Sequence, residues 1–231
     1  MKKISLIIGS ILILIAASGI VMLFFNKPDS TESTGARDRY VALGDSVAAG
    51  VGLKGDSDSS ACGRTDESYP KKVANEMGYD LVDIACTAAT LQNGINGVQD
   101  VNGLSVGPQI EQLLKETQPR LISFTIGAND AGWVDVIGTC YVGNCNTPEE
   151  KYKVGQNLQQ MALNLSNTLN QIGAYYMDTP PTVVVTGYHQ VFPKEVTGTC
   201  RDLTGIDADE ISWGRQMQED INARIKTVVG E

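Results

Sequence analysis

Four short apolar runs, separated by longer segments with helical spacing, constrain the possible folds of this chain most strongly. The runs are rich in Val, Ile and Leu, which is typical of strands that are buried on both faces of a parallel sheet. Strands that alternate with helices predict an α/β domain with a mainly parallel sheet. The predicted strands cover residues 40–44, 80–85, 120–127 and 181–187.

The segments between these runs carry signals for helices. We predict helices near residues 69–77 and over about 107–116. The sequence TPEE, beginning at Thr147, has the pattern of a capping box with proline at the first helical position, and it predicts the start of a long helix. A last helix is predicted to begin near Asp207, which again has a glutamate three residues later.

Polar or small residues follow each predicted strand, at the edge of the sheet where ligands of parallel α/β folds bind. Ser46 follows the first strand, Ala88 the second, Asn129 the third and His189 the fourth. A nucleophilic serine needs a base to take its proton, and the oxyanion that it creates needs hydrogen-bond donors. The backbone N–H groups of Ser46 and Ala88 and the amide of Asn129 are candidate donors. The alternative is that Ser46 and Asn129 only cap helices or turns.

Five segments, in order along the chain, resemble the SGNH or GDSL-type hydrolases, and most closely the disulfide-rich secreted branch of esterases and lipases. The resemblance extends from about Tyr40 to the last residue of the chain. The segments are YVALGDSVAAGVG, CGRTDESYP, LVDIACTAAT, PQIEQLLKETQPRLISFTIGANDAG and VVVTGYHQVFP.

This resemblance implies a three-layer α/β/α fold with a flavodoxin-like, mainly parallel sheet whose last strand is missing from the chain. It also implies a serine ester hydrolase, either an esterase or a lipase, that needs no cofactor. Ser46 would be the nucleophile, Ala88 a backbone oxyanion donor at a position that is usually glycine, and Asn129 the side-chain donor. Val47 departs from the leucine that is usual in the first motif.

The base histidine of this family lies in an Asp-x-x-His motif near the C-terminus, and the chain has no such motif. Its single histidine, His189, stands where this branch usually has proline. We therefore interpret His189 as a loop residue without a catalytic role, and the alternative is that it substitutes for the missing base. We therefore expect the chain to be a truncated version of a longer enzyme and to have little or no turnover as it stands. A catalytically inactive cell-surface module that binds glycans or lipids is the alternative function.

The chain has five cysteines, and disulfides are expected if the domain lies outside the cytoplasm. A zinc site is disfavoured because there is no CxxC pair and only one histidine. The resemblance implies the pairs Cys62–Cys86 and Cys140–Cys145. It leaves Cys200 unpaired, because the partner of this cysteine would lie in the missing C-terminal segment.

An apolar run, Ile4–Phe25, contains no charge over 22 residues. As a helix it would be ~33 Å long, which matches a hydrocarbon core of about 30 Å. We predict a transmembrane anchor over residues 1–25. The alternatives are a signal peptide cleaved after Ser18 and a buried helix. Lys2 and Lys3 precede the run and are expected to stay in the cytoplasm, which places the rest of the chain outside.

The predicted anchor is followed by a polar linker over residues 26–38 and by the hydrolase-like domain over residues 39–231. A net charge of −9 argues against nucleic-acid binding. The acidic segment 56–67 partly fits a calcium loop, but Ala61 stands where that loop needs glycine, so a calcium site is disfavoured. The expected partners are an ester of a lipid or of an acetylated glycan, and the membrane, with the protein as a monomer.

Overall fold

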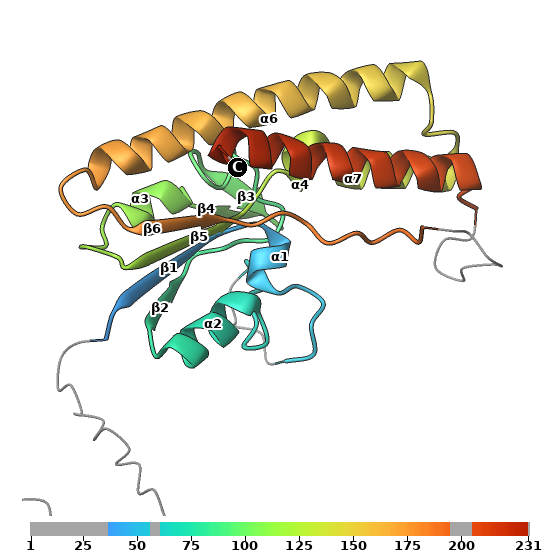
Figure 1. Ribbon diagram of the computed structural model, residues 1–231. Coiled ribbons are helices and arrows are strands. Elements are labelled where there is room, and N and C mark those ends of the chain that lie inside the picture. The colour runs from blue at the N-terminus through green and yellow to red at the C-terminus, as the bar shows by residue number, and fades with distance from the viewer. Residues whose placement is uncertain (1–36, 56–60, 195–204, 231) are drawn as a thin grey trace, which may run out of the picture. The chain divides into compact units, whose positions relative to one another are not determined.

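A computed structural model describes residues 37–55, 61–194 and 205–230 of the chain. These residues form an α/β domain around a parallel sheet (Figure 1). The sheet has the order β2-β1-β5-β6. The first strand, β1, therefore lies in the interior of the sheet and later strands lie on both of its sides, as in flavodoxin-like folds. All four predicted strands are confirmed, as β1 (Arg39–Gly44), β2 (Asp80–Asp83), β5 (Leu121–Thr125) and β6 (Thr182–Val185).

All four predicted helices are also present. They are α2 (Tyr69–Met77), α3 (Gln109–Leu113), α6 (Pro148–Tyr175) and α7 (Ala208–Val229). The structure adds short elements that the sequence patterns did not indicate. These are α1 (Ser46–Ala49), α4 (Ala128–Ala131), α5 (Trp133–Val142) and a hairpin of β3 (Gln99–Val101) with β4 (Leu104–Val106).

The predicted anchor over residues 1–25, almost all of the linker, and Cys200 lie outside the described residues. Within the part of the chain that the structure describes, no helix has both the length and the apolar character required to span a bilayer.

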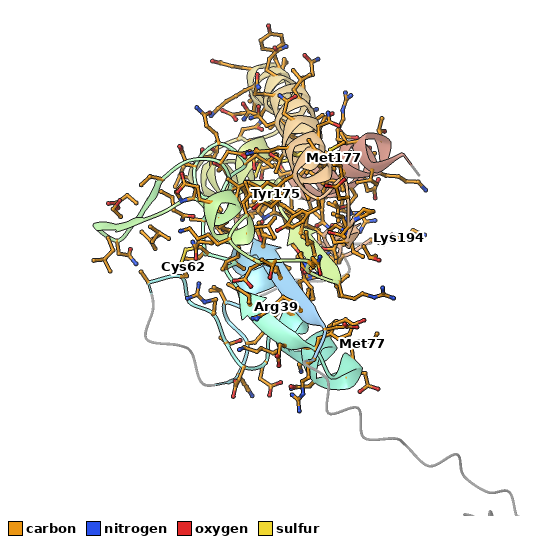
Figure 2. The ribbon with its side chains drawn as sticks, turned by 90° about the vertical axis from the view of Figure 1, so that its left-hand side faces the viewer. Arg39, Cys62, Met77, Tyr175, Met177 and Lys194 are labelled. Carbon is orange, nitrogen blue, oxygen red and sulfur yellow. A yellow bond between two sulfur atoms is a disulfide. The ribbon has the colours of Figure 1, made fainter. Side chains whose placement is uncertain are left out.

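Side chains of β1 alternate between the two faces of the sheet and thereby build a core on each side. Val41 and Leu43 belong to the large core beneath α6 and α7, whereas Tyr40 and Ala42 pack against the face that α2 covers. Figure 1 and Figure 2 both place α6 and α2 on opposite sides of the sheet. The domain therefore has the three layers that the resemblance implied.

The two long helices pack on the sheet through apolar stripes and are capped at their N-termini as the sequence indicated, with one difference. Asp207 and Glu210 form a complete capping box at the start of α7. At the start of α6, the Thr147 hydroxyl accepts a hydrogen bond from the Glu150 N–H at 3.2 Å, but the reciprocal bond of a full box is not formed. The predicted box at Thr147 is therefore only half present.

The expectation of burial on both faces is wrong for β6. Val183 and Val184 are 36% and 43% exposed. Among the described strands, β6 pairs only with β5 and so forms an edge of the sheet. An apolar run indicates a strand, but it does not show how much of that strand the rest of the fold covers.

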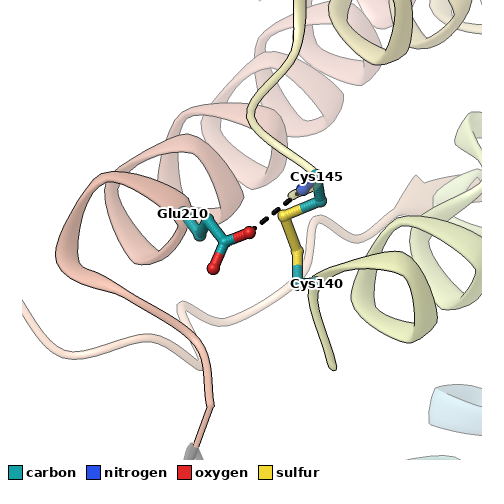
Figure 3. A group of neighbouring side chains, drawn as sticks. All are labelled: Cys140, Cys145 and Glu210. Atoms are coloured by element: carbon teal, nitrogen blue, oxygen red, sulfur yellow. Dashed lines mark hydrogen bonds between the residues drawn. A yellow bond between two sulfur atoms is a disulfide. The ribbon is translucent and has the colours of Figure 1, made fainter. Parts of the chain in front are cut away.

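Both disulfides implied by the resemblance are present, Cys62–Cys86 and Cys140–Cys145. The Cys145 N–H donates a 3.0 Å hydrogen bond to the Glu210 carboxylate (Figure 3). The ligand atoms of Cys140, Cys145 and Glu210 lie within 4.8 Å of one another, a spacing that could suit a metal ion. However, metals bind thiolates and these two sulfurs are joined in a disulfide, which disfavours a metal ion at this group. The hydrogen bond to Cys145 instead means that Glu210 links the first turn of α7 to the segment between α5 and α6.

Candidate active site

Ser46 is the first residue of α1 and follows directly on the end of β1. The turn before it requires glycine, because Gly44 has a φ of +137° and a Cβ there would lie 2.3 Å from the Thr125 carbonyl oxygen. The buried Gln109 amide pairs with both backbone groups of Gly44, at 2.9 Å each. The Asp45 N–H also donates to the Thr125 oxygen at 2.9 Å, so the backbone leading to Ser46 is held on two sides.

The buried Asp45 carboxylate connects the Ser46 turn to the rest of this edge of the sheet. One oxygen accepts the Val47 N–H at 2.9 Å and so caps α1. The other accepts the Tyr188 hydroxyl at 2.5 Å, and the Tyr188 oxygen in turn accepts the Ala128 N–H at 3.1 Å. Tyr188 thus bridges the turn after β1 and the turn after β5 from its own position after β6.

Burial raises the pKa of the Asp45 carboxyl to about 6, although the hydrogen bonds from Tyr188 and Val47 counteract this effect. Burial and the neighbouring charge of Asp45 hold the pKa of Tyr188 well above its usual value. The proton of this short bond therefore stays on Tyr188, which acts as the donor while Asp45 acts as the acceptor.

Adjacent residues of α4 fix the turn that contains Ala88. The Asn129 amide donates to the Ala89 carbonyl at 2.9 Å. The Asp130 carboxylate accepts the Leu91 N–H, at 2.9 and 3.2 Å to its two oxygens, and burial raises the pKa of this carboxyl to about 6. The turns after β2 and β5 are therefore held against each other.

Ala88 has a φ of +60°, in the left-handed region that favours glycine. This conformation gives a physical reason for the glycine that the resemblance leads us to expect at this position. Within the described residues, neither the Ser46 N–H nor the Ala88 N–H donates to a protein acceptor. One N–H of the Asn129 amide is also left over after its bond to Ala89, so all three predicted donors can still bind a ligand.

A pocket of about 160 Å³ lies at this edge of the sheet. It brings together Ser46, Asn129 and His189, but Ala88 is not among the residues that line it. His189 is exposed, and no hydrogen bond joins it to Ser46. Most of the pocket wall is apolar, with contributions from Val47, Trp133, Val134, Val191 and Ile221.

The comparison with family models agrees with this geometry. The model described as the GDSL-like Lipase/Acylhydrolase family matches residues 42–231. The chain belongs to this family. Two curated relatives are similar to this chain. A lipase from Streptomyces rimosus is 31% identical over 189 residues (80% of this chain and 63% of the relative), and Lipase 2 from Streptomyces coelicolor is 25% identical over 201 residues (83% and 66%). The chain therefore spans about two thirds or less of the length of these relatives.

Two solved structures have a similar fold. An extracellular lipase from Streptomyces rimosus matches with a TM-score of 0.65 and 28% identity, covering 83% of this chain and 76% of that one. A phospholipase A1 from Streptomyces albidoflavus matches with a TM-score of 0.63 and 25% identity, covering 84% and 76%. The α/β architecture and the parallel sheet are thus those of the lipases in this family.

Four residues of the site were missed by the sequence reasoning: Asp45, Gln109, Asp130 and Tyr188. Asp45 and Asp130 lie within the sequence motifs, but nothing in the sequence indicated which backbone groups their carboxylates accept hydrogen bonds from. Gln109 lay within a predicted helix, and its contact with Gly44 joins residues 65 positions apart. For Tyr188, the one signal in the sequence was its position just after a predicted strand.

Replacing Tyr188 with phenylalanine should lower the free energy of unfolding by about 1–3 kcal/mol, because Asp45 and the Ala128 N–H would each lose a buried partner. Urea denaturation of the full chain measures this change. Tyr175→Phe is the matched control, since the Tyr175 hydroxyl also bonds a backbone carbonyl, that of Leu114, but belongs to an exposed side chain. Equal stability of the two variants would contradict the bridging role of Tyr188.

The stability should also depend on pH through Asp130. Its pKa is about 6 in the folded protein, against an ordinary value of 3.8, so the folded state binds more protons than the unfolded state between these two pH values. Stability contributed by this group is therefore lost as the pH rises. The advantage of Asp130→Asn over wild type should grow by up to about 3 kcal/mol between pH 4 and pH 7. The difference between the two chains cancels the carboxyls that do not interact with Asp130, whereas the smaller coupling to Asp45 remains. A difference that stays flat would contradict the assignment.

Proposed function

We propose that the domain over residues 39–231 is an extracytoplasmic serine ester hydrolase with Ser46 as its nucleophile. The N–H groups of Ser46 and Ala88 and the amide of Asn129 form the oxyanion hole. The observation that carries the proposal is that Ser46 and Asn129 line one pocket. Within the described residues, the N–H groups of Ser46 and Ala88 donate to no protein acceptor, and one N–H of the Asn129 amide is left over after its bond to Ala89. Membership of the GDSL-like family supports the same chemistry.

The reaction follows from these groups. The Ser46 oxygen attacks the ester carbonyl carbon as its proton leaves to a base, and the carbonyl oxygen becomes an oxyanion. Donors fixed before the reaction stabilise that charge without further reorganisation. When the oxyanion collapses, the alcohol leaves with a proton and an acyl group remains on Ser46. Water then attacks the acyl group, which releases the acid and restores the serine.

The base is the incomplete part of this site. The sequence of residues 1–231 contains one histidine and no Asp-x-x-His motif. His189 lines the same pocket as Ser46 but makes no hydrogen bond to it. We therefore propose slow turnover for residues 1–231, with His189 as at most a weak substitute for the base.

The pocket supports an ester with an apolar acyl group. Its 160 Å³ is close to the roughly 150 Å³ of an apolar cavity that accommodates benzene, so a short acyl chain fits inside. Longer chains would extend over the exposed side chains of Val134 and Val191 at its mouth. The names of the relatives, lipases and a phospholipase A1, are consistent with such substrates.

The proposed location outside the cytoplasm rests on separate observations. The described residues include two disulfides, and disulfides form and persist in oxidising compartments. One structural relative is described as extracellular. We propose that residues 1–25 anchor the domain to the outer side of the membrane, with secretion after cleavage as the alternative.

A second candidate function is a binding module without catalysis. It is favoured by the single histidine, since loss of a triad member leaves only a small residual rate. In this case the pocket would hold an acyl group or a glycan substituent without cleaving it.

Hydrolysis of 4-nitrophenyl butyrate by the full chain, with and without added imidazole, distinguishes the two functions. Imidazole is small enough to enter the pocket and supplies the missing base. We expect the rate above the Ser46→Ala background to be low alone and to rise at least about tenfold with imidazole, in the range that general base catalysis contributes. If no rate above that background appears at any imidazole concentration, the binding module is the better account.

A further inference from the structure

A second, polar groove lies between α6 and the segment that follows the Ala88 turn. Its volume is about 580 Å³, several times that of the pocket at Ser46. Uncharged amides dominate its lining, four from α6 and two from the segment 91–96. They are Gln160, Asn164, Asn167 and Gln171, together with Gln92 and Asn96.

The four amides of α6 are spaced by four, three and four residues, so they form one stripe along the helix. The chain has no charged residue from position 154 to position 177, although the protein as a whole is 19% charged. The exposed stripe of a surface helix is normally rich in charge. Helix stability does not explain the amides either, because asparagine is a poorer helix former than lysine or glutamate.

The floor of the groove is held in place by hydrogen bonds. The Asn96 amide donates to the Leu91 carbonyl at 2.8 Å and to the buried Thr168 hydroxyl at 2.7 Å. On the helix side, the Gln160 amide donates to the Asn164 side-chain oxygen at 2.9 Å. Several polar atoms of the lining are therefore fixed before any ligand arrives, which reduces the entropy lost on binding.

We propose that this groove binds a neutral oligosaccharide. Each amide offers two donors and an acceptor, and each sugar hydroxyl is both a donor and an acceptor, so the two surfaces are complementary. None of the lining residues is charged, so the groove offers no opposite charge to a phosphate, a sulfate or a uronic acid. The amides also make the groove unsuited to an acyl chain, because polar groups lose hydrogen bonds to water without replacement.

The groove is adjacent to the proposed oxyanion turn. Leu91 at its floor is three residues from Ala88, so their Cα atoms are separated by at most about 11 Å. Leu91 is also held by Asp130, the neighbour of Asn129. A sugar chain in the groove would therefore bring its ester substituents close to the Ala88 turn. This last step rests on the proposed function, whereas saccharide binding itself does not.

Calorimetric titration of the full chain with cellohexaose, xylohexaose and maltohexaose tests the proposal without needing catalysis. We expect at least one of them to bind with a dissociation constant below about 1 mM. The double variant Asn164→Ala/Asn167→Ala should bind at least tenfold more weakly. Alanine favours the helix, so this variant should remain folded. Gln159→Ala, an exposed amide of α6 outside the groove, is the matched control and should bind as the wild type does.

The proposal would be overturned by no heat of binding with any hexasaccharide, by equal binding by the double variant, or by equal losses in the double variant and the Gln159 control. Self-association that the double variant abolishes, without saccharide binding, would also overturn it and assign the stripe to a contact between two copies. Ser46→Ala should bind the saccharide unchanged, which separates failure of this proposal from failure of the proposed hydrolase.

Discussion

Ser46→Ala should reduce the imidazole-stimulated hydrolysis of 4-nitrophenyl butyrate by at least about 100-fold, measured above the rate of the same imidazole buffer without protein, because among the described residues Ser46 is the serine that lines the pocket at the end of β1. Ser46 lies at the carboxyl end of β1, hydrogen bonds hold the backbone that leads to it, and it lines an apolar pocket. The rate is measured by release of nitrophenolate at saturating imidazole.

Ser105→Ala is the matched control for this variant. Ser105 lies in β4 and is exposed, so its loss removes a hydroxyl without touching the pocket. Its rate should equal that of the wild type. If Ser46→Ala retained the wild-type rate, the hydrolysis would come from another group and the assignment of the nucleophile would be wrong.

Asn129→Ala should lower kcat by about 10²–10³, the usual effect of removing one oxyanion donor, with a much smaller change in KM. The charge on the oxyanion develops only in the transition state, so the loss of the Asn129 amide slows the chemical step more than it weakens binding of the ester. The same assay, run over a range of ester concentrations, gives the two constants separately.

The structural role of Asn129 needs its own control, because its amide also donates to the Ala89 carbonyl. Asn157→Ala serves this purpose, since Asn157 donates to the Ala131 carbonyl at 3.2 Å and does not line the pocket. It should leave kcat within a few-fold of the wild type. Equal losses in both variants would mean that Asn129 acts through the fold rather than on the oxyanion.

Much of the fold could be predicted because it depends on local patterns. The apolar runs gave all four strands of the sheet, and the caps at Thr147 and Asp207 located the starts of the two longest helices. The exposure of β6 could not be predicted, because it depends on which strands lie beside it. The short α1 and α4 were also missed, since helices of one turn carry no periodicity to detect.

The site was predictable only where a motif carries its chemistry. Ser46 and Asn129 were found from short motifs, and the structure brings them to one pocket. The contacts that hold them could not be predicted, because they join distant parts of the chain. Tyr188 and Asp45 are 143 positions apart, and Asp130 and Leu91 are 39 apart. Such pairs become visible only once the sheet places the ends of its strands side by side.

Covalent labelling tests the role of Ser46 most directly. The full chain is incubated with a fluorophosphonate in the presence of imidazole, digested and examined by tandem mass spectrometry, with an active serine hydrolase in the same tube as a positive control. We predict one phosphonyl adduct, on the Ser46 hydroxyl, and slower labelling of Asn129→Ala. An adduct on another residue, or an unlabelled chain beside a labelled control, would contradict the assignment of Ser46 as the nucleophile.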